Sequence, residues 1–279
     1  MAVVNTNVGA SVAQAALAKN ARELNGAMTQ LSTGQKINSA ADDASGLAIT
    51  NRMTSQINGL GAAIKNANDG ISMIQTAEGA LDEVTDMLQR MRELAVQAAS
   101  GTMSAQDNDY VDLEFEALKA EIERVAQNTE WNGTAILDDT VGASSDGVVS
   151  FQVGVDASQT ISVDFGDLTA ATGTGSGFAA ADLDTNTLAG TAIGLLDTAI
   201  EAISNQRATF GAAANRLEHA VDNLTNVKVN AEASRSRILD TDYAESTAEL
   251  ARTQIIQQAG TAMLAQANQL PQTVLALLQ

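Results

Sequence analysis

Apolar residues recur at intervals of three and four along two long stretches of the chain. With one change of phase near Glu78, the first stretch carries Ile57, Leu60, Ile64, Ala67, Ile71, Ile74, Leu81, Val84, Leu88, Met91, Ala95 and Ala98. The second carries Ile193, Leu196, Ile200, Ile203, Phe210, Ala214, Leu217, Val221 and Leu224, with Arg207 among them. This spacing keeps the apolar side chains on one face of a helix and predicts coiled-coil or bundle packing. Core packing explains both stripes without a cofactor.

The length of the first stripe bears on shape. A helix over residues 57–98 would be about 63 Å long at 1.5 Å per residue. A compact globule of this chain length would be only about 50 Å across. The pattern therefore predicts an elongated rod built from long antiparallel helices.

Local signals divide the chain further. Gly101 is predicted to cap the long helix, and Ser104 with Asp107 predicts a capping box for a helix ending near Gln127. The turn motif WNG follows at 131–133.

Period-two alternation in the middle of the chain predicts a β-hairpin around a short polar turn. The alternating apolar residues are Val149, Phe151, Val153, Val155, Ile161, Val163 and Phe165. The Gly- and Thr-rich stretch after the hairpin is expected to be a loop.

These patterns predict a mainly α fold with a small β region and paired terminal helices. We expect residues 1–44 with 236–279 to form a terminal helical domain. A helical rod would comprise 45–138 with 191–235, and residues 139–190 would form its hairpin and loop region.

The two ends of the chain carry thin apolar seams. Near the start, Leu17, Leu24 and Leu31 lie seven residues apart, as does Ala10 before them. The seam of the tail contains Ile256, Ala259, Met263, Ala267, Leu270, Val274 and Leu277. From Thr253 onward the tail has no charged residue. Such a helix suits surroundings made of copies of itself, where amides form hydrogen bonds and no charge loses its hydration.

Composition excludes several classes of function. The formal net charge is −19 and there is no cysteine, which argues against nucleic acid, anionic membranes, disulfides and thiolate metal sites. There is no apolar run long enough for a membrane span, and the first residues lack the features of a cleaved secretory signal. We expect no cofactor.

Candidate catalytic residues are few. His219 is the only histidine, so a metal-binding HExxH helix and a multi-histidine site are excluded. The acidic pairs Asp42–Asp43 and Asp138–Asp139 are interpreted as turn or cap residues. The chain is not expected to be an enzyme.

Longer motifs carry a resemblance to a known family. They are LSTGQKINSAADDASGLAI at 31–49, QRMRELAVQAASGT at 89–102, NTEWNG at 128–133, and SRILDTDYAESTAELARTQIIQQAGTAMLAQANQLPQTVLALL at 236–278. With these motifs the chain closely resembles the bacterial flagellins.

The resemblance implies a structural subunit of an extracellular filament for motility, whose terminal helices line its interior. It implies unfolded export through the flagellar type III apparatus, a chaperone on the C-terminal helix, and cap and junction proteins as further partners. The outer projecting domains of larger relatives are expected to be absent. The alternative is a hook–filament junction adaptor of the same apparatus, and filament assembly by the chain alone would distinguish the two.

The resemblance also implies a contact site for the flagellin-sensing Toll-like receptor of animals. Its residues would be Arg90 and Leu94 in the motif QRMRELAVQ, and Glu114 on the following helix. Arg90 and Glu114 would equally suit subunit contacts or a solvated surface.

Overall fold

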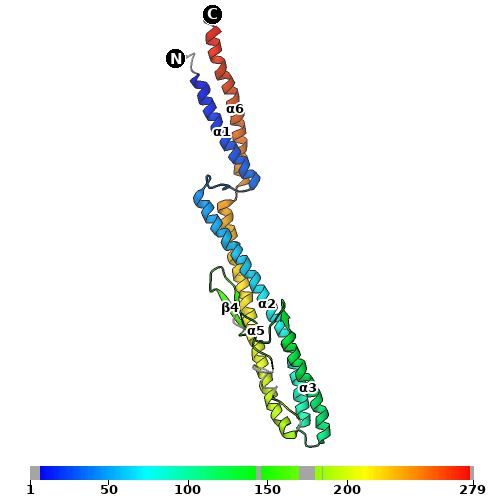
Figure 1. Ribbon diagram of the computed structural model, residues 1–279. Coiled ribbons are helices and arrows are strands. Elements are labelled where there is room, and N and C mark those ends of the chain that lie inside the picture. The colour runs from blue at the N-terminus through cyan, green and yellow to red at the C-terminus, as the bar shows by residue number, and fades with distance from the viewer. Residues whose placement is uncertain (1–6, 143–145, 170–179, 184, 277–279) are drawn as a thin grey trace. The chain divides into compact units, whose positions relative to one another are not determined.

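In the computed structural model, the described residues are 7–142, 146–169, 180–183 and 185–276. At residues 186 and 270–276 the description covers the backbone alone. The helices are α1 (Val8–Thr33), α2 (Ala44–Ala98), α3 (Ala105–Asn128), α5 (Asn186–Leu239) and α6 (Tyr243–Ala276). The strands are β1 (Glu130–Trp131), β2 (Thr134–Ala135), β3 (Val148–Gln152) and β4 (Thr160–Asp164). The predicted class, mainly helical with a small antiparallel region, is confirmed (Figure 1).

The chain divides into two compact units. The terminal unit comprises residues 1–57 with 229–279, and the central unit comprises 58–228. Helices α2 and α5 contribute residues to both units. Each unit is described separately below.

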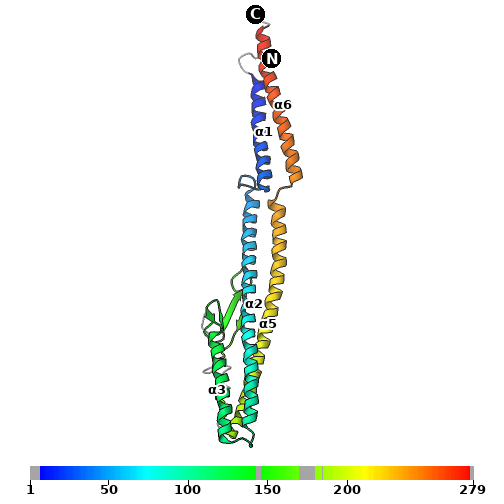
Figure 2. The ribbon, with the colours of Figure 1, turned by 90° about the vertical axis from the view of Figure 1, so that its right-hand side faces the viewer.

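The core of the central unit is formed by α2, α3, α5 and the β3–β4 hairpin. Leu81, Leu88 and Met91 of α2 are fully buried, as are Leu196 and Phe210 of α5. The predicted stripes face this core from Ala67 to Ala98 and from Ile193 to Val221, because their spacing of three and four holds the apolar residues on one side of each helix. Figures 1 and 2 show α2, α3 and α5 side by side.

Arg207, the charged residue within the α5 stripe, lies at the edge of this packing. Its guanidinium forms an ion pair of 3.0 Å with Asp82 of α2. Arg92 of α2 pairs with Asp197 of α5 at 2.6 Å. The stripe therefore accommodates a charge where the seam meets solvent.

Helix α3 begins with the predicted capping box. The Ser104 side chain accepts a hydrogen bond from the Asp107 backbone, and the Asp107 side chain accepts one from the Ser104 backbone. The predicted cap at Gly101 is wrong, because α2 ends at Ala98 and the positive-φ glycines of the described chain do not include Gly101. The polar turn before Ser104 ends the helix without a left-handed residue.

The two hairpins follow the predicted turn signals. Asn132 and Gly133 both have positive φ, as the tight turn between β1 and β2 requires. In the second hairpin, Phe151 of β3 pairs with Ile161 of β4. Phe151 lies against α2 at Gly70, where a β-carbon would be only 3.0 Å from its ring. Glycine at this position therefore lets the hairpin approach the helix.

The terminal unit pairs α1 with α6 in antiparallel fashion, and Figures 1 and 2 show the two helices side by side. The segment that follows α1 and the segment that precedes α6 are joined by backbone hydrogen bonds. The Lys36 backbone N–H donates to the Leu239 carbonyl at 2.7 Å, and that of Thr241 donates to Gly34 at 3.0 Å. Gly34 ends α1 in the left-handed conformation. The two hydrogen bonds hold the segment before α2 against the segment before α6.

Candidate functional site

The terminal unit is held by two rows of residues on each of its paired helices. On α1, one row consists of Ala10, Leu17, Leu24 and Leu31, and the other of Ala13, Asn20 and Ala27; all are buried or half-buried. On α6, one row consists of Ser246, Thr253, Gly260 and Ala267, and the other of Leu250, Gln257 and Leu264; these too are buried or half-buried. Every row has a spacing of seven residues, as in a coiled coil.

The two helices approach each other closely at Gly260. A β-carbon on Gly260 would lie 2.6 Å from the Leu17 Cδ2 atom. Nearby, the buried Asn20 amide donates to the Thr253 carbonyl at 2.9 Å and to Gln257 Oε1 at 3.0 Å. Small and polar residues of α6 therefore face the leucines and the asparagine of α1.

The predicted seam residues of α1 meet the partner helix, whereas the large described ones of α6 do not. Leu17, Leu24 and Leu31 lie on the face of α1 that meets α6. In α6, by contrast, Ile256 is 39% exposed and Met263 is 65% exposed. Helix α1 does not bury these two side chains, because α6 presents small residues to it; their contact with neighbouring copies stays a prediction. The side chains of Leu270 and Val274, and all of Leu277, lie outside the described residues.

The terminal unit carries an apolar surface that no part of the described chain covers. Its large exposed apolar residues are Val8, Val12, Met28, Ile49, Val229, Tyr243, Ile255, Ile256 and Met263. Its buried apolar residues, by contrast, are Ala27, Ile37 and Ile57. Seven of these nine residues lie on the paired helices α1 and α6, and exposed apolar residues that gather in one region mark a site that binds another protein.

The loop before α2 is organised by its two aspartates. Asp42 accepts hydrogen bonds from the Ser39 and Asn38 backbones, and Asp43 accepts from the Gly46 and Ser45 backbones at the start of α2. Hydrogen bonds from Ser39 lower the pKa of Asp42, and one from Gly46 lowers that of Asp43. Their interpretation as turn and cap residues is confirmed. Asp138 similarly accepts from the Thr140 backbone.

The predicted receptor residues lie in the central unit. The Arg90 guanidinium forms an ion pair of 2.9 Å with Glu114 of α3 and one of 3.0 Å with Glu93. The side chains of Arg90 and Glu114 are about half exposed, at 50% and 49%. Leu94 is only 2% exposed and belongs to the core. The structure thus brings Arg90 and Glu114 together on the surface, whereas Leu94 is buried in the core.

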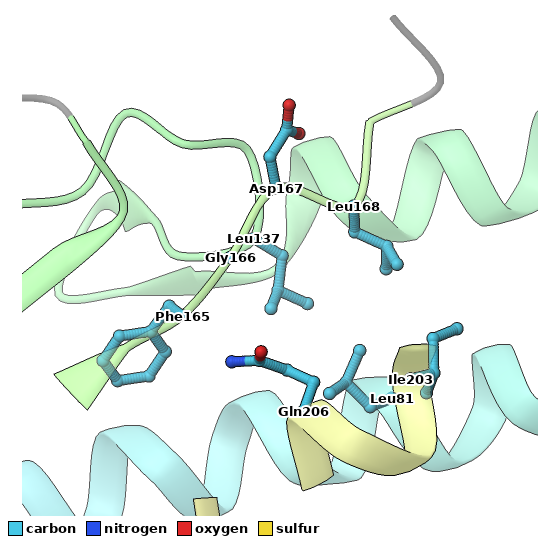
Figure 3. Close-up of a pocket in the computed structure, with 8 residues that line it drawn as sticks. All are labelled: Leu81, Leu137, Phe165, Gly166, Asp167, Leu168, Ile203 and Gln206. Carbon is cyan, nitrogen blue, oxygen red and sulfur yellow. The ribbon is translucent and has the colours of Figure 1, made fainter. Parts of the chain in front are cut away.

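The central unit also contains a cavity of about 10 Å³ between α2, α5 and the chain after β4 (Figure 3). Leu81, Leu137, Phe165 and Ile203 provide most of its lining. The Gln206 amide donates to the Asp164 carbonyl at 2.6 Å, and the Asp167 carboxylate points away from the cavity. A space of this size holds at most one water molecule.

In the described part of the chain, His, Cys, Asp and Glu form no group of three that could hold a metal ion. No described helix has an apolar stretch long enough to cross a bilayer. The surface of the terminal unit is therefore the feature that most needs a partner.

Comparison with known proteins identifies the family of the chain. The pattern of the "Bacterial flagellin N-terminal helical region" matches residues 4–141, and that of the "Bacterial flagellin C-terminal helical region" matches residues 193–278. A flagellin of Halalkalibacterium halodurans is 46% identical over 279 residues, covering 99% of this chain and 100% of the relative. This chain belongs to the bacterial flagellin family.

Further relatives agree with this assignment. The flagellar filament 33 kDa core protein of Treponema phagedenis is 42% identical, covering 99% of this flagellin and 100% of the relative. Flagellin A of Vibrio anguillarum is 36% identical and covers 99% of both chains. That alignment extends over 375 residues, so the Vibrio protein is the longer of the two.

Solved structures resemble this flagellin as well. The crystal structure of Bacillus cereus flagellin has a TM-score of 0.50 and 37% identity, covering 57% of this chain and 88% of that one. A putative flagellar hook-associated protein from Vibrio parahaemolyticus has a TM-score of 0.59, but at 15% identity it shows the fold alone.

Membership in this family establishes the biological role. The chain is a structural subunit of the flagellar filament and polymerises with copies of itself. Flagellins are a structural family, so the chain is not an enzyme. Nothing in the comparisons favours the hook-junction alternative.

The sequence pattern alone missed the polar residues that join the paired helices. Asn20, Thr253, Gln257 and Gly260 lie on the contact face, whereas the prediction followed the largest apolar residues of the tail. One signal was present, because Asn20 stands midway between Ala13 and Ala27 at heptad spacing.

Proposed function

We propose that the terminal unit is the polymerisation element of this flagellin and that neighbouring copies cover its exposed apolar residues in the filament. The observation that carries the proposal is the surface of α1 and α6, on which Met28, Ile255 and Met263 are each more than half exposed. Because the tail is uncharged from Thr253, copies can surround it without removing a charge from water.

A pair of charge substitutions tests this proposal. Ile256→Asp and Met263→Asp should prevent filament growth, since each would place an unpaired carboxylate in an apolar contact. Val155→Asp is the matched control, because Val155 is an exposed apolar residue of the central unit at 44%. Electron microscopy of purified chains would show filaments with the control only. Normal filaments from both terminal variants would refute the proposal.

The same surface supports the proposed export partner. A chaperone that covers α6 would shield Ile255, Ile256 and Met263 before assembly, and the type III apparatus would export the chain unfolded to the cell exterior. Deleting residues 253–279 should abolish binding to the purified flagellin chaperone, measured by calorimetry. Binding by the truncated chain at unchanged affinity would contradict this proposal.

Cap and junction proteins would contact the same apolar helices at the two ends of the filament. Subunits at each end lack a neighbour on one side, so their terminal units stay partly uncovered.

The proposed domain division places the terminal helices in 1–44 with 236–279, the helical rod in 45–138 with 191–235, and the hairpin region in 139–190. The chain breaks at 34–43 and 240–242 support the inner boundaries.

We place the receptor contact on the Arg90 and Glu114 surface, with Leu94 acting through core packing. A receptor carboxylate would compete with Glu114 and Glu93 for the Arg90 guanidinium. Arg90→Ala should weaken receptor signalling by soluble monomer about tenfold, a typical loss for one charge-assisted contact.

Arg92→Ala is the matched control for that experiment. Arg92 is similarly exposed, at 45%, but faces α5 through its ion pair with Asp197. A reporter-cell assay would compare the two variants. Equal potency of both variants and the parent chain would exclude Arg90 from the contact.

A further inference from the structure

The apolar rows of α1 and α6 repeat every seven residues, which makes their register ambiguous. Leu17 lies against Gly260, and in an antiparallel pair this register places Leu24 level with Thr253 and Leu31 level with Ser246. A slip of one heptad would again set leucines against small residues. Bulk and hydrophobicity of these rows therefore distinguish poorly between the native register and its neighbours.

The second pair of rows does not have this symmetry. On α1 the row reads Ala13, Asn20, Ala27, and on α6 it reads Leu250, Gln257, Leu264. In the native register the two amides meet, with 3.0 Å between Asn20 Nδ2 and Gln257 Oε1. A slip of one heptad in either direction would place Asn20 opposite a leucine.

Burial makes this match energetically important. Asn20 is 3% exposed, and its amide hydrogens are used by Thr253 and Gln257. The Thr253 carbonyl can only accept, which fixes the orientation of the Asn20 amide. Asn20 Oδ1 is consequently buried without a hydrogen-bond partner in the described structure. The unpaired oxygen lowers the stability of the folded chain. Ala13 and Ala27 show that alanine fits the same heptad row.

Other contacts between the two helices distinguish less between the native register and the slipped registers. Arg252 pairs with Glu23 at 3.5 Å, but both side chains are substantially exposed, and exposed ion pairs contribute little. At the far end, Asn7 donates to the Ala267 carbonyl at 2.8 Å; a backbone carbonyl is available at every register. Asn20 with Gln257 remains the pair whose chemistry is specific to one alignment.

From this arrangement we infer that Asn20 is a positioning residue that fixes the register of α1 on α6. It does so by excluding slipped pairings in which its buried amide would face Leu250 or Leu264. A buried asparagine in an apolar seam selects alignment at the expense of stability. The inference concerns pairing within one chain and does not depend on the proposed polymer contacts.

Disulfide trapping can measure the register, because the chain contains no native cysteine. Leu17→Cys with Gly260→Cys reports the native register, since these positions are in contact. Leu17→Cys with Ala267→Cys reports a slip of one heptad in one direction, and Ala10→Cys with Gly260→Cys reports a slip in the other. Dilute full-length monomer favours intramolecular bonds, which migrate differently from linked dimers on a denaturing gel.

Each cysteine pair is combined with Asn20, with Asn20→Ala, or with Asn25→Ala. The last variant is the matched control, because it removes an exposed asparagine amide from the same helix. We expect slipped pairs to form disulfides about tenfold more readily, relative to the native pair, in the Asn20→Ala chain. The Asn25→Ala chain should keep the native preference.

The result that would overturn the inference is an Asn20→Ala chain with the same native preference as its parent. Gln257→Leu provides an independent readout, because it removes the acceptor from α6 and should release the register similarly. Retention of the native preference in both variants would assign Asn20 a purely local role. Circular dichroism of each variant confirms that the helices persist during the measurement.

Discussion

The terminal and central units bury opposite kinds of residue. The central unit encloses large apolar side chains such as Phe115, Leu88 and Phe210, all with no exposed surface. In the terminal unit, four of the buried residues are polar: Asn20, Thr50, Ser246 and Thr253. That unit meanwhile exposes nine of the fifteen large apolar residues that are exposed in the described chain.

One chain therefore contains a core of large buried side chains and, in the terminal unit, paired helices with large apolar residues that stay exposed in a single subunit. The central unit buries its largest apolar side chains within its own core. The terminal unit keeps its helices aligned with small and polar contacts and leaves apolar area outside. Burial of that area by other copies would supply free energy that is absent from the single subunit.

The largest expected effect is the loss of filaments when the tail is removed. Deleting Thr253 to Gln279 should abolish polymerisation, because each large apolar side chain of the tail contributes roughly 1.5–3 kcal/mol when fully buried. The central unit should unfold at an unchanged denaturant concentration. Sedimentation measures the first effect and Trp131 fluorescence the second, since Trp131 packs against the central core. Filaments from the truncated chain would contradict this comparison.

A core substitution should give the opposite result. Phe210→Ala removes a fully buried ring that lies 5.2 Å from the Phe165 ring, and should destabilise the central unit by about 3–5 kcal/mol. Met263→Ala, in the exposed surface of α6, should change stability by less than about 0.5 kcal/mol. Urea denaturation followed by circular dichroism compares them, because the helices of both units contribute to this signal. Equal losses would mean that the two units are not different in kind.

Substitutions at two glycines of α2 distinguish the effect of helix propensity on stability from the effect of packing in the central unit. Gly70→Ala would place a β-carbon 3.0 Å from the Phe151 ring and should cost about 1–3 kcal/mol through overpacking. A β-carbon on Gly79 would have no neighbour within 4 Å. Gly79→Ala should therefore stabilise the helix by about 0.5–1 kcal/mol. Thermal denaturation gives both signs, and a gain at both positions would show that the hairpin does not press on α2.

The smallest expected effect concerns the cap of α2 in the terminal unit. Hydrogen bonds in the folded state lower the pKa of Asp43 below its ordinary value. The stabilisation is therefore present above the unfolded-state pKa and is lost as the pH falls through the lowered value, below about pH 4. Asp43→Asn should reduce the acid dependence of hydrogen exchange at residues 44–50. An unchanged dependence between pH 5 and pH 3 would rule out this contribution.

The sequence predicted the central unit better than the terminal one for a physical reason. Leu81, Leu88 and Met91 contrast with charged neighbours, so their periodicity identifies the buried face. The capping box at Ser104 and the turn at Asn132 have similarly local causes. Gly101 failed as a cap because a glycine near a helix end does not require a left-handed conformation.

The contact face of α6 could not be read from its hydrophobic pattern. Its apolar residues are distributed around the helix, so the bulky Ile256 and Met263 suggested one face while Gly260 and Thr253 determined another. Close approach depends on the absence of side-chain volume, which a hydrophobicity pattern does not record. The resemblance carried over residue types alone, so it could not predict that Leu94 is buried.

Methionine oxidation tests the account most directly, because methionines occur on both kinds of surface. Met28 and Met263 are exposed in the terminal unit, whereas Met73 and Met91 are buried in the central core. Brief peroxide treatment followed by mass spectrometry would measure sulfoxide formation at each residue in monomer and in filament. We predict rapid oxidation of Met28 and Met263 in the monomer, strong protection of both in the filament, and slow oxidation of Met73 and Met91 in both states. Equal oxidation of Met28 and Met263 in monomer and filament would contradict the claim that neighbouring copies cover the terminal unit.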